Sequence, residues 1–260
     1  MKEQSLLLVN IENGICTLTI NLPQKHNILT RETFTELGSV LRSVGEDGDS
    51  RVVILRGAGE KAFSAGYDIK RLTQTEDVDN EDPLEEVILA IENCSIPVIA
   101  MIYGYCIGAG CGLASACDLR LAADNARLGI TAARLGAIYP PGATLSLINL
   151  VGITTAKEML YTGRRYDARK AEEMGLVNQV VVTNHLAETT YDLAREIADN
   201  SPLSVRGNKK IISRLLNYHS QNIEEREVFL SLQKQAAKSS DLKEGLRAFS
   251  EKRKPVFRGE

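Results

Sequence analysis

Tryptophan is absent from this chain of 260 residues, and histidine is scarce. The three histidines, His26, His185 and His219, lie far apart in the sequence and offer too few ligands for a histidine-based zinc site. Cysteine occurs five times, an odd number without CxxC spacing, among apolar or small neighbours. This pattern favours buried free thiols in a reducing compartment over disulfides or a thiolate metal site. We therefore expect no metal ion in this protein.

Long hydrophobic runs and an excess of either charge are also lacking. The longest apolar stretches fall well short of the roughly 18 residues that suggest a membrane-spanning helix, and the N-terminal segment does not resemble a signal peptide. Lysine and arginine number 31 against 34 acidic residues, which gives a net charge of −3. Such a balance does not favour binding to nucleic acid or to a membrane surface. These absences predict a cytoplasmic protein with neither kind of partner.

The sequence contains instead the pattern of an α/β protein. Apolar and β-branched runs around an Asn-Gly pair predict a β-hairpin over 6–20, a helix over 30–44 and a buried strand over 51–56. The order of strand, helix and strand implies a parallel crossover. Beyond residue 186 almost every segment is compatible with a helix. The chain therefore reads as an N-terminal α/β core with a C-terminal helical extension.

A glycine-rich stretch over 104–114 carries the first candidate for chemistry. A buried strand over 97–103 leads into it, and a helix over 113–117 is expected to follow. A helix that begins after clustered glycines presents unpaired backbone N–H groups and the positive end of its dipole. Gly108 and Gly110 would let another group approach this backbone closely. The stretch is thus either an oxyanion-binding site or a tight turn without chemistry.

Two loops complete the set of candidate segments. The first, over 62–70, places the small residues of 64–66 directly before Tyr67 and Asp68, and a polar, acidic segment over 73–83 follows it. A helix is expected over 84–94. The second loop, over 128–144, is rich in glycine and proline, and two helices are expected after it, from residues 145 and 154.

The two glycine-containing turns, over 63–70 and 104–112, resemble the paired signatures of the crotonase (enoyl-CoA hydratase/isomerase) superfamily. The resemblance covers nearly the whole chain, in order and at the spacing of the family. Five further segments carry it, at 22–29, 116–120, 161–168, 172–181 and 244–255.

This resemblance implies the fold and the binding mode. The fold is an α/β spiral of ββα repeats over residues 1–195, which binds an acyl-CoA thioester, and a C-terminal helical region over 196–260, which forms a homotrimer or a dimer of trimers. Coenzyme A belongs to the substrate, so no separate cofactor is expected. The carbonyl oxygen of the thioester would accept hydrogen bonds from the backbone N–H groups of Tyr67 and Ala109. Fixed donors at that position stabilise an enolate as it forms.

Further substrate contacts follow from the same resemblance. Phe249 and Lys252 match positions that reach the adenine and phosphates of CoA, often from a neighbouring subunit, and Lys25 and His26 could contact the nucleotide. Solvated surface side chains are the alternative for Lys25, His26 and Lys252, and a purely structural role in fixing its loop is the alternative for Asp68. The residues placed around the thioester and the acyl group are Ala65, Gly66, Asp68, Ile69, Gly108, Gly112 and Ala132.

The sequence departs from the hydratases of the superfamily at both of their glutamates. Gly112 and Ala132 stand at those positions, and neither side chain can exchange a proton. Among the reactions of the superfamily, decarboxylation depends least on a protein base, because loss of CO2 itself generates the enolate. We therefore predict a decarboxylase of a malonyl-type CoA ester.

The loop after residue 129 is similar to that of the methylmalonyl-CoA decarboxylases. The similarity assigns to Thr131 and Tyr139 the orientation of the carboxylate and the donation of a hydrogen bond or proton. Both could instead be plain loop residues. Those enzymes differ in having histidine at the position of Tyr67 and glutamate at that of Gly112, and they lack the Pro-Pro pair at 140–141.

Two alternatives stay open. The first is a hydratase, isomerase or lyase that takes its acid and base from Tyr67, Tyr139 or the acidic segment 77–82. The second is a catalytically inactive homologue that binds CoA.

Overall fold

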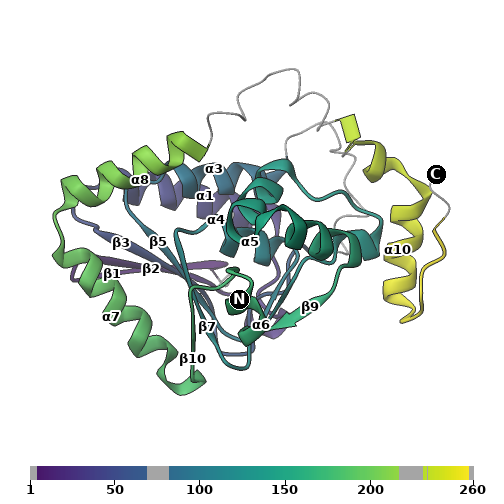
Figure 1. Ribbon diagram of the computed structural model, residues 1–260, viewed down its shortest axis with the longest axis horizontal. Helices are drawn as coiled ribbons and strands as arrows, with labels where there is room; N and C mark the ends of the chain where they lie inside the picture. Colours follow the sequence, from purple (N-terminus) through teal and green to yellow (C-terminus); the bar gives the residue numbers. More distant parts are fainter. Residues whose placement is uncertain (1–4, 69–81, 217–230, 233, 258–260) are drawn as a thin grey trace.

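Two β-sheets form the centre of the computed structural model, which describes residues 5–68, 82–216, 231–232 and 234–257 (Figure 1). The larger sheet has six strands in the order β1-β2-β3-β5-β7-β10, and the smaller has four in the order β4-β6-β8-β9. The strands of the larger sheet are β1 (Leu7–Glu12), β2 (Ile15–Ile20), β3 (Val52–Gly57), β5 (Val98–Ile102), β7 (Leu119–Ala123) and β10 (Gln179–Val181). Those of the smaller sheet are β4 (Ala62–Ser64), β6 (Tyr105–Ile107), β8 (Arg127–Gly129) and β9 (Arg165–Asp167).

The strand directions follow from the connections. β1 and β2 form the predicted antiparallel hairpin, whose turn has positive φ at Asn13 (51°) and Gly14 (75°), as a tight turn between twisted strands requires. All other neighbours in the larger sheet are parallel, including β2 and β3, which α1 joins as expected. In the smaller sheet β4, β6 and β8 are parallel and β9 is antiparallel.

Helices cover both faces of the larger sheet. In β3, Val53 and Leu55 belong to the apolar cluster that α1 and α3 share, whereas Val52 and Ile54 face a second cluster that includes Leu186 of α7. Both faces of β3 are therefore buried, which explains its unbroken apolar run. Figure 1 shows α1, α3 and α4 on one side of this sheet and α7 on the other. The helices are α1 (Arg31–Glu46), α3 (Pro83–Asn93), α4 (Ala109–Ala116), α5 (Pro141–Thr162), α6 (Ala168–Glu173), α7 (Leu186–Asp199), α8 (Pro202–Leu216) and α10 (Ser240–Ser250). The 3-10 turns are η1 (Pro23–Lys25), η2 (Ala132–Leu135) and η3 (Thr183–His185).

The structure corrects three expectations about element boundaries. α4 begins at Ala109 and not at residue 113. The predicted loop over 128–144 contains part of β8, η2 and the first turn of α5. The two helices expected from residues 145 and 154 are confirmed, because α5 is broken between them at Gly152, whose backbone is not helical (φ 72°). The loops over 62–70 and 104–112 contain β4 and β6. Within the described part of the chain, no helix is long and apolar enough to cross a membrane.

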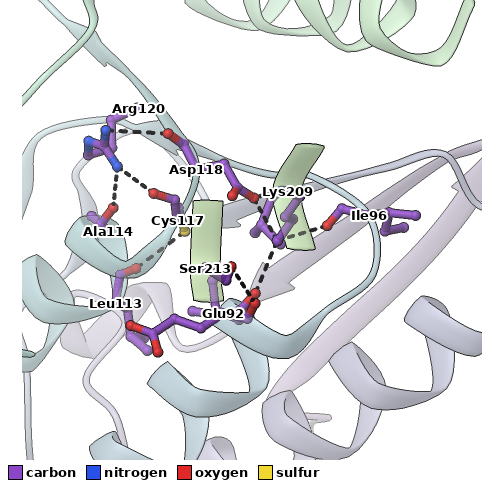
Figure 2. A network of polar contacts seen from close by, with 11 residues as sticks. Glu92, Ile96, Leu113, Ala114, Cys117, Asp118, Arg120, Lys209 and Ser213 are labelled. Atoms are coloured by element: carbon purple, nitrogen blue, oxygen red, sulfur yellow. Dashed lines mark hydrogen bonds and ion pairs between the residues drawn. The ribbon is translucent and has the colours of Figure 1, made fainter. Parts of the chain in front are cut away.

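The side chain of Lys209 fixes α8 to the α/β core (Figure 2). This lysine is only 7% exposed, and its Nζ donates hydrogen bonds to the carbonyl oxygens of Ile91 (3.1 Å) and Ile96 (3.0 Å). It also forms an ion pair of 2.7 Å with Asp118, whose Oδ2 accepts the N–H of Val98 at the start of β5. The ammonium group thus joins the end of α3, the start of β5 and the start of β7.

We expect Lys209→Met to lower the free energy of unfolding by about 2–3 kcal/mol, because the substitution leaves Asp118 without its cation and removes the ammonium donor from the carbonyl oxygens of Ile91 and Ile96. The carboxylate is 33% exposed, which keeps the loss below that of a fully buried pair. Urea denaturation would measure the change. Lys210→Met, at an exposed position of the same helix, is the matched control and should stay within about 0.5 kcal/mol of the wild type. Equal losses in both variants would contradict the role given to Lys209.

Candidate active site

Two glycine turns meet at the carboxyl ends of neighbouring strands. β4 and β6 are parallel and paired, so the residues that follow them lie side by side. A Cβ atom added to Gly66, after β4, would lie 2.8 Å from the carbonyl oxygen of Ile107 and 3.3 Å from the backbone nitrogen of Ala109. A Cβ on Gly110 would lie 2.7 Å from the Ser64 carbonyl oxygen. Only glycine allows this closeness of the two backbones.

The backbone N–H groups of Tyr67 and Ala109 face the rim where the turns meet. Leu29 forms a parallel bridge around Tyr67: its N–H donates to the carbonyl of Gly66 (2.8 Å), and its carbonyl accepts the N–H of Asp68 (3.1 Å). In such a bridge the N–H of the central residue, here Tyr67, points away from the partner strand. Ala109 is the first residue of α4, where N–H groups lack acceptors within the helix and the dipole is positive. Backbone N–H groups in such positions are suited to bind an oxyanion, and this role of Tyr67 and Ala109 stays a prediction.

Asn27 ties the loop before Leu29 to the start of β4, a role that the sequence did not indicate. The residue is 1% exposed, and its backbone φ is 53°. Its Nδ2 donates to the carbonyls of Ala58 (3.0 Å) and Ala62 (2.7 Å), and its Oδ1 accepts the N–H of Leu22 (3.0 Å). An Asn in a loop that follows a proline is the signal that could have found it, because Asn tolerates a left-handed backbone and bonds to nearby backbone groups.

Tyr139 occupies the space beside Gly112. A Cβ atom on Gly112 would lie only 2.6 Å from the Tyr139 hydroxyl oxygen, and that hydroxyl donates a hydrogen bond of 3.1 Å to the carbonyl of Gly108. The phenol therefore lies where a side chain at position 112 would begin, next to the first residue of α4. Burial raises the pKa of Tyr139 well above its ordinary value, which keeps the hydroxyl protonated and able to donate.

The side chain of Tyr67 is held by groups on two helices. Its hydroxyl donates to Oδ1 of Asp82, and its ring packs against Phe34 of α1 with a centroid separation of 5.2 Å. Asp82 is the N-cap of α3 and accepts the N–H of Leu84 (2.9 Å). Burial raises the pKa of both Tyr67 and Asp82. The sequence analysis named Tyr67 as a candidate site residue, whereas it included Asp82 only as the last residue of the acidic segment 77–82.

The loop with Thr131 and Ala132 lies against α10. Thr131 precedes η2 and is half-buried, as is Ala132, which packs against the core. A Cβ on Gly136, just after η2, would lie 2.8 Å from the carbonyl of Asp241 in α10. The C-terminal region therefore supports the loop that was predicted to border the substrate.

The predicted nucleotide contacts are not brought to the meeting point of the two turns as buried groups. The side chains of Lys25, His26, Phe249 and Lys252 are exposed. The backbone of His26 nevertheless takes part, because its carbonyl accepts the N–H of Ala65 (2.9 Å). Ile69 and the segment 77–81 lie outside the described residues.

The five cysteines are buried free thiols, as predicted, and burial delays the titration of two of them, Cys16 and Cys117. Burial raises the pKa of Cys16 from 9.0 to about 11 and that of Cys117 to about 12.

The unfolded chain therefore loses these protons at a lower pH than the folded protein does, and stability should fall as the pH rises above 9. Urea denaturation from pH 9 to pH 11 should show this fall, and Cys16→Ala should reduce its slope by about 1.4 kcal/mol per pH unit. An unchanged slope would contradict the assignment.

This chain is similar to known proteins over nearly its whole length. The sequence model of the family described as Enoyl-CoA hydratase/isomerase matches residues 10–260. The putative enoyl-CoA hydratase/isomerase YngF of Bacillus subtilis is 35% identical over 98% of both chains, and the short-chain-enoyl-CoA hydratase of Clostridium acetobutylicum is 33% identical over 97% of both.

Solved structures show the same likeness. A methylmalonyl-CoA decarboxylase in complex with 2-nitronate-propionyl-CoA superimposes with a TM-score of 0.89 at 28% identity, over 98% of this chain and 99% of that one. An enoyl-CoA hydratase from Bacillus anthracis superimposes with a TM-score of 0.76 at 36% identity, over 98% and 100%. The expected mixed α/β fold with C-terminal helices is thereby confirmed.

Proposed function

This chain belongs to the enoyl-CoA hydratase/isomerase family, the crotonase family of acyl-CoA enzymes, and on that premise we propose that it decarboxylates a malonyl-type CoA ester. The observation that carries the proposal is the position of Tyr139. Its hydroxyl fills the space where a side chain at position 112 would begin, so this site is built around a phenol in place of a carboxylate. Ala132, at the second position expected to carry glutamate, adds no proton-exchanging group.

The chemistry needs few groups beyond the oxyanion donors. The bond between C2 and the substrate carboxylate breaks, CO2 leaves, and the electron pair passes to the thioester as an enolate. Two fixed N–H groups, on Tyr67 and Ala109, stabilise that charge, and such donors are worth roughly 3–4 kcal/mol each. Thr131 orients the carboxylate that leaves. The phenol of Tyr139 releases its hydrogen bond to the Gly108 carbonyl and gives its proton to C2 of the enolate, and the phenolate then recovers a proton from water.

The remaining predicted contacts fit this reaction as binding groups. Gly66 and Gly108 let the thioester approach the donors, and Ala65 and Asp68 flank Gly66 and Tyr67 in the first turn. Ile69, outside the described residues, is retained as a proposed contact on the resemblance alone. The exposed side chains of Lys25, His26, Phe249 and Lys252 stay available for the CoA nucleotide.

The test is a substrate panel. The purified protein is incubated with malonyl-CoA, methylmalonyl-CoA, ethylmalonyl-CoA and crotonyl-CoA, and the products are identified by mass. Loss of CO2 from a malonyl-type ester supports the proposal. Addition of water to crotonyl-CoA contradicts it, and CoA binding without any turnover would instead indicate an inactive homologue.

One observation favours a second candidate, a proton-transfer reaction such as hydration or isomerisation. The carboxylate of Asp82 is joined by a hydrogen bond to the hydroxyl of Tyr67, whose backbone is part of the site. Such a pair can exchange protons where the usual glutamates are missing. A gain of the mass of water on crotonyl-CoA in the panel distinguishes hydration from decarboxylation, and a change in chromatographic retention at constant mass would reveal isomerisation.

We also propose that the region 196–260 assembles the protein into a homotrimer or a dimer of trimers. α8 exposes large apolar side chains that a monomer would leave in water. Light scattering on the purified protein tests this, and a monomer at micromolar concentration would contradict it. The exposed side chains of α8 are Leu203, Ile211, Ile212, Leu215 and Leu216.

A further inference from the structure

We infer that the first turn of α3 sets the geometry of this site, with Asp82 and Glu85 as positioning residues that hold Tyr67 and the segment carrying Tyr139. The inference rests on the proposed function, since it supposes that Tyr67 and Tyr139 act on an acyl-CoA. In the proposed decarboxylation, α3 and its N-cap contribute none of the groups that contact the substrate, yet the first turn of α3 touches three of the segments that do.

Asp82 makes the first of these contacts. Its Oδ1 accepts two hydrogen bonds, one from the N–H of Leu84 within the turn and one from the hydroxyl of Tyr67. Tyr67 is thus held at both ends, by Leu29 on its backbone and by Asp82 on its side chain. The direction of its N–H depends on both restraints. Asp82 thereby orients an oxyanion donor without contacting the oxyanion.

Leu84 makes the second contact. Its Cδ2 lies 3.2 Å from the place of a Cβ on Gly112, and the leucine is fully buried. It closes the side of the Gly112 position that the Tyr139 hydroxyl leaves open. This contact fixes α3 against α4 at the level of the oxyanion rim.

Glu85 makes the third contact. Its Oε1 accepts the N–H of Gly142 (2.6 Å), and its Oε2 lies where a Cβ on that glycine would be. α5 has no cap of its own, because the residue before its first turn is Pro140. Glu85 therefore caps α5 from another helix and places a negative charge at its positive end.

Two prolines transmit the position of the α5 cap to Tyr139, because they restrict the backbone between them. Only Pro140 and Pro141 separate Tyr139 from Gly142, and the proline rings fix φ at both intervening positions. Fixing Gly142 therefore fixes the direction from which Tyr139 enters the site. The spacing of Asp82 and Glu85 places both carboxylates on one turn, so that one rigid element holds both loops.

Three variants isolate the part of Asp82. Asp82→Ser keeps a good N-cap for α3 but is too short to hold the Tyr67 hydroxyl, Asp82→Asn keeps both hydrogen bonds, and Tyr67→Phe removes the hydroxyl while leaving the N–H. Bound propionyl-CoA labelled isotopically at its carbonyl carbon reports on the oxyanion donors, because hydrogen bonds lower the carbonyl stretching frequency. We expect Asp82→Ser and Tyr67→Phe to lose most of the wild-type shift and Asp82→Asn to retain it. Asp167→Ser, which alters the N-cap of α6, is the matched control and should keep the wild-type shift.

We expect kcat to fall in the same variants that lose the carbonyl shift. Asp82→Ser is expected to lower kcat by about 10- to 100-fold with little change in KM, because a small misplacement of a donor acts on the transition state. The double variant with Tyr67→Phe should lose no more than Tyr67→Phe alone.

Glu85 is tested by rescue. Glu85→Ala should lower kcat by about 10-fold or more, whereas Glu85→Gln, which still accepts the Gly142 N–H, should restore most of it. In a Tyr139→Phe background Glu85→Ala should cost little more. Glu172→Ala removes a carboxylate that accepts the N–H of Val180 (2.8 Å) away from these loops and should leave kcat unchanged.

The outcomes separate this inference from the proposed function. A carbonyl shift that is the same in all variants overturns the role of Asp82, whatever reaction is found, and a failure of Glu85→Gln to rescue overturns that of Glu85. The expected pattern of shifts without decarboxylation of any ester would overturn the proposed reaction and support the positioning. Failure of the wild type to bind propionyl-CoA would overturn both.

Discussion

Replacing Gly66 by alanine is expected to lower kcat by about 10²- to 10³-fold while the protein stays folded, the loss found when an oxyanion donor is removed. Gly66 has a φ of 90°, and its Cβ would lie 2.8 Å from the Ile107 carbonyl oxygen and 3.3 Å from the nitrogen of Ala109. The added methyl group would therefore push the turn of Tyr67 away from the start of α4. The two N–H groups would then no longer converge on one oxygen. Steady-state kinetics on the substrate that the panel identifies would measure the loss, and circular dichroism would check the fold.

Gly59 supplies the control for backbone strain. It has a φ of 73°, and no atom lies within 4 Å of the place of its Cβ. Gly59→Ala carries a similar conformational penalty, of about 1–2 kcal/mol in stability, without a clash. We expect its kcat to match that of the wild type. Full activity in Gly66→Ala, or an equal loss in both variants, would refute the convergence of the two turns.

Tyr139→Phe is expected to lower kcat by about 100-fold with CoA affinity retained. The variant removes the hydroxyl that donates to the Gly108 carbonyl and stands at the Gly112 position, but it keeps the ring in place. Loss of one hydrogen-bonding or acid group at the reacting centre typically costs this much. Separate measurements of kcat and of CoA-ester affinity check it. A kcat equal to that of the wild type would show that the Tyr139 hydroxyl takes no part in the reaction and that the residue only packs in the site.

Gly112→Ala tests the same contact from the other side. When Tyr139 is intact, the methyl group added by Gly112→Ala would lie 2.6 Å from the Tyr139 hydroxyl oxygen. In the Tyr139→Phe protein that oxygen is absent. We expect Gly112→Ala to destabilise the wild type by about 1–3 kcal/mol and the Tyr139→Phe protein by clearly less. Strictly additive effects would show that the phenol does not occupy the Gly112 space in solution.

Local patterns allowed much of the fold to be predicted. The β1–β2 hairpin follows from an Asn-Gly turn between apolar runs, and α1 from the cap at Thr30 and the apolar stripe of Phe34, Leu37 and Leu41. The smaller sheet was missed because strands β4, β6, β8 and β9 have three residues each, too few to show a period of two. The start of α4 was placed late because its glycines, poor helix formers, are required by contact with the Ser64 backbone.

The candidate site could be predicted only where one short segment carries the signal. The turns with Tyr67 and Ala109 were found from glycine spacing and family resemblance. The contacts of Tyr139 with Gly112 and of Glu85 with Gly142 join residues 27 and 57 positions apart, and no local pattern encodes such pairs. Asp82 stood out in the sequence only as the last residue of the acidic segment 77–82. Its contact with Tyr67 joins residues 15 positions apart, and no local pattern encodes that pair either.

The anchoring of α3 by Lys209 also constrains the order in which the protein matures. Lys209 lies 118 positions after Ile91, and Ser213, whose hydroxyl donates to the Glu92 carbonyl, lies 121 positions after its acceptor. A nascent chain released as far as Tyr139 holds the groups proposed for the reaction, yet lacks the partners for the last turn of α3. Contacts of such long sequence separation form late, because loop closure must precede them. Catalytic competence should therefore arise only near the end of synthesis, when α8 closes onto a core that has already collapsed.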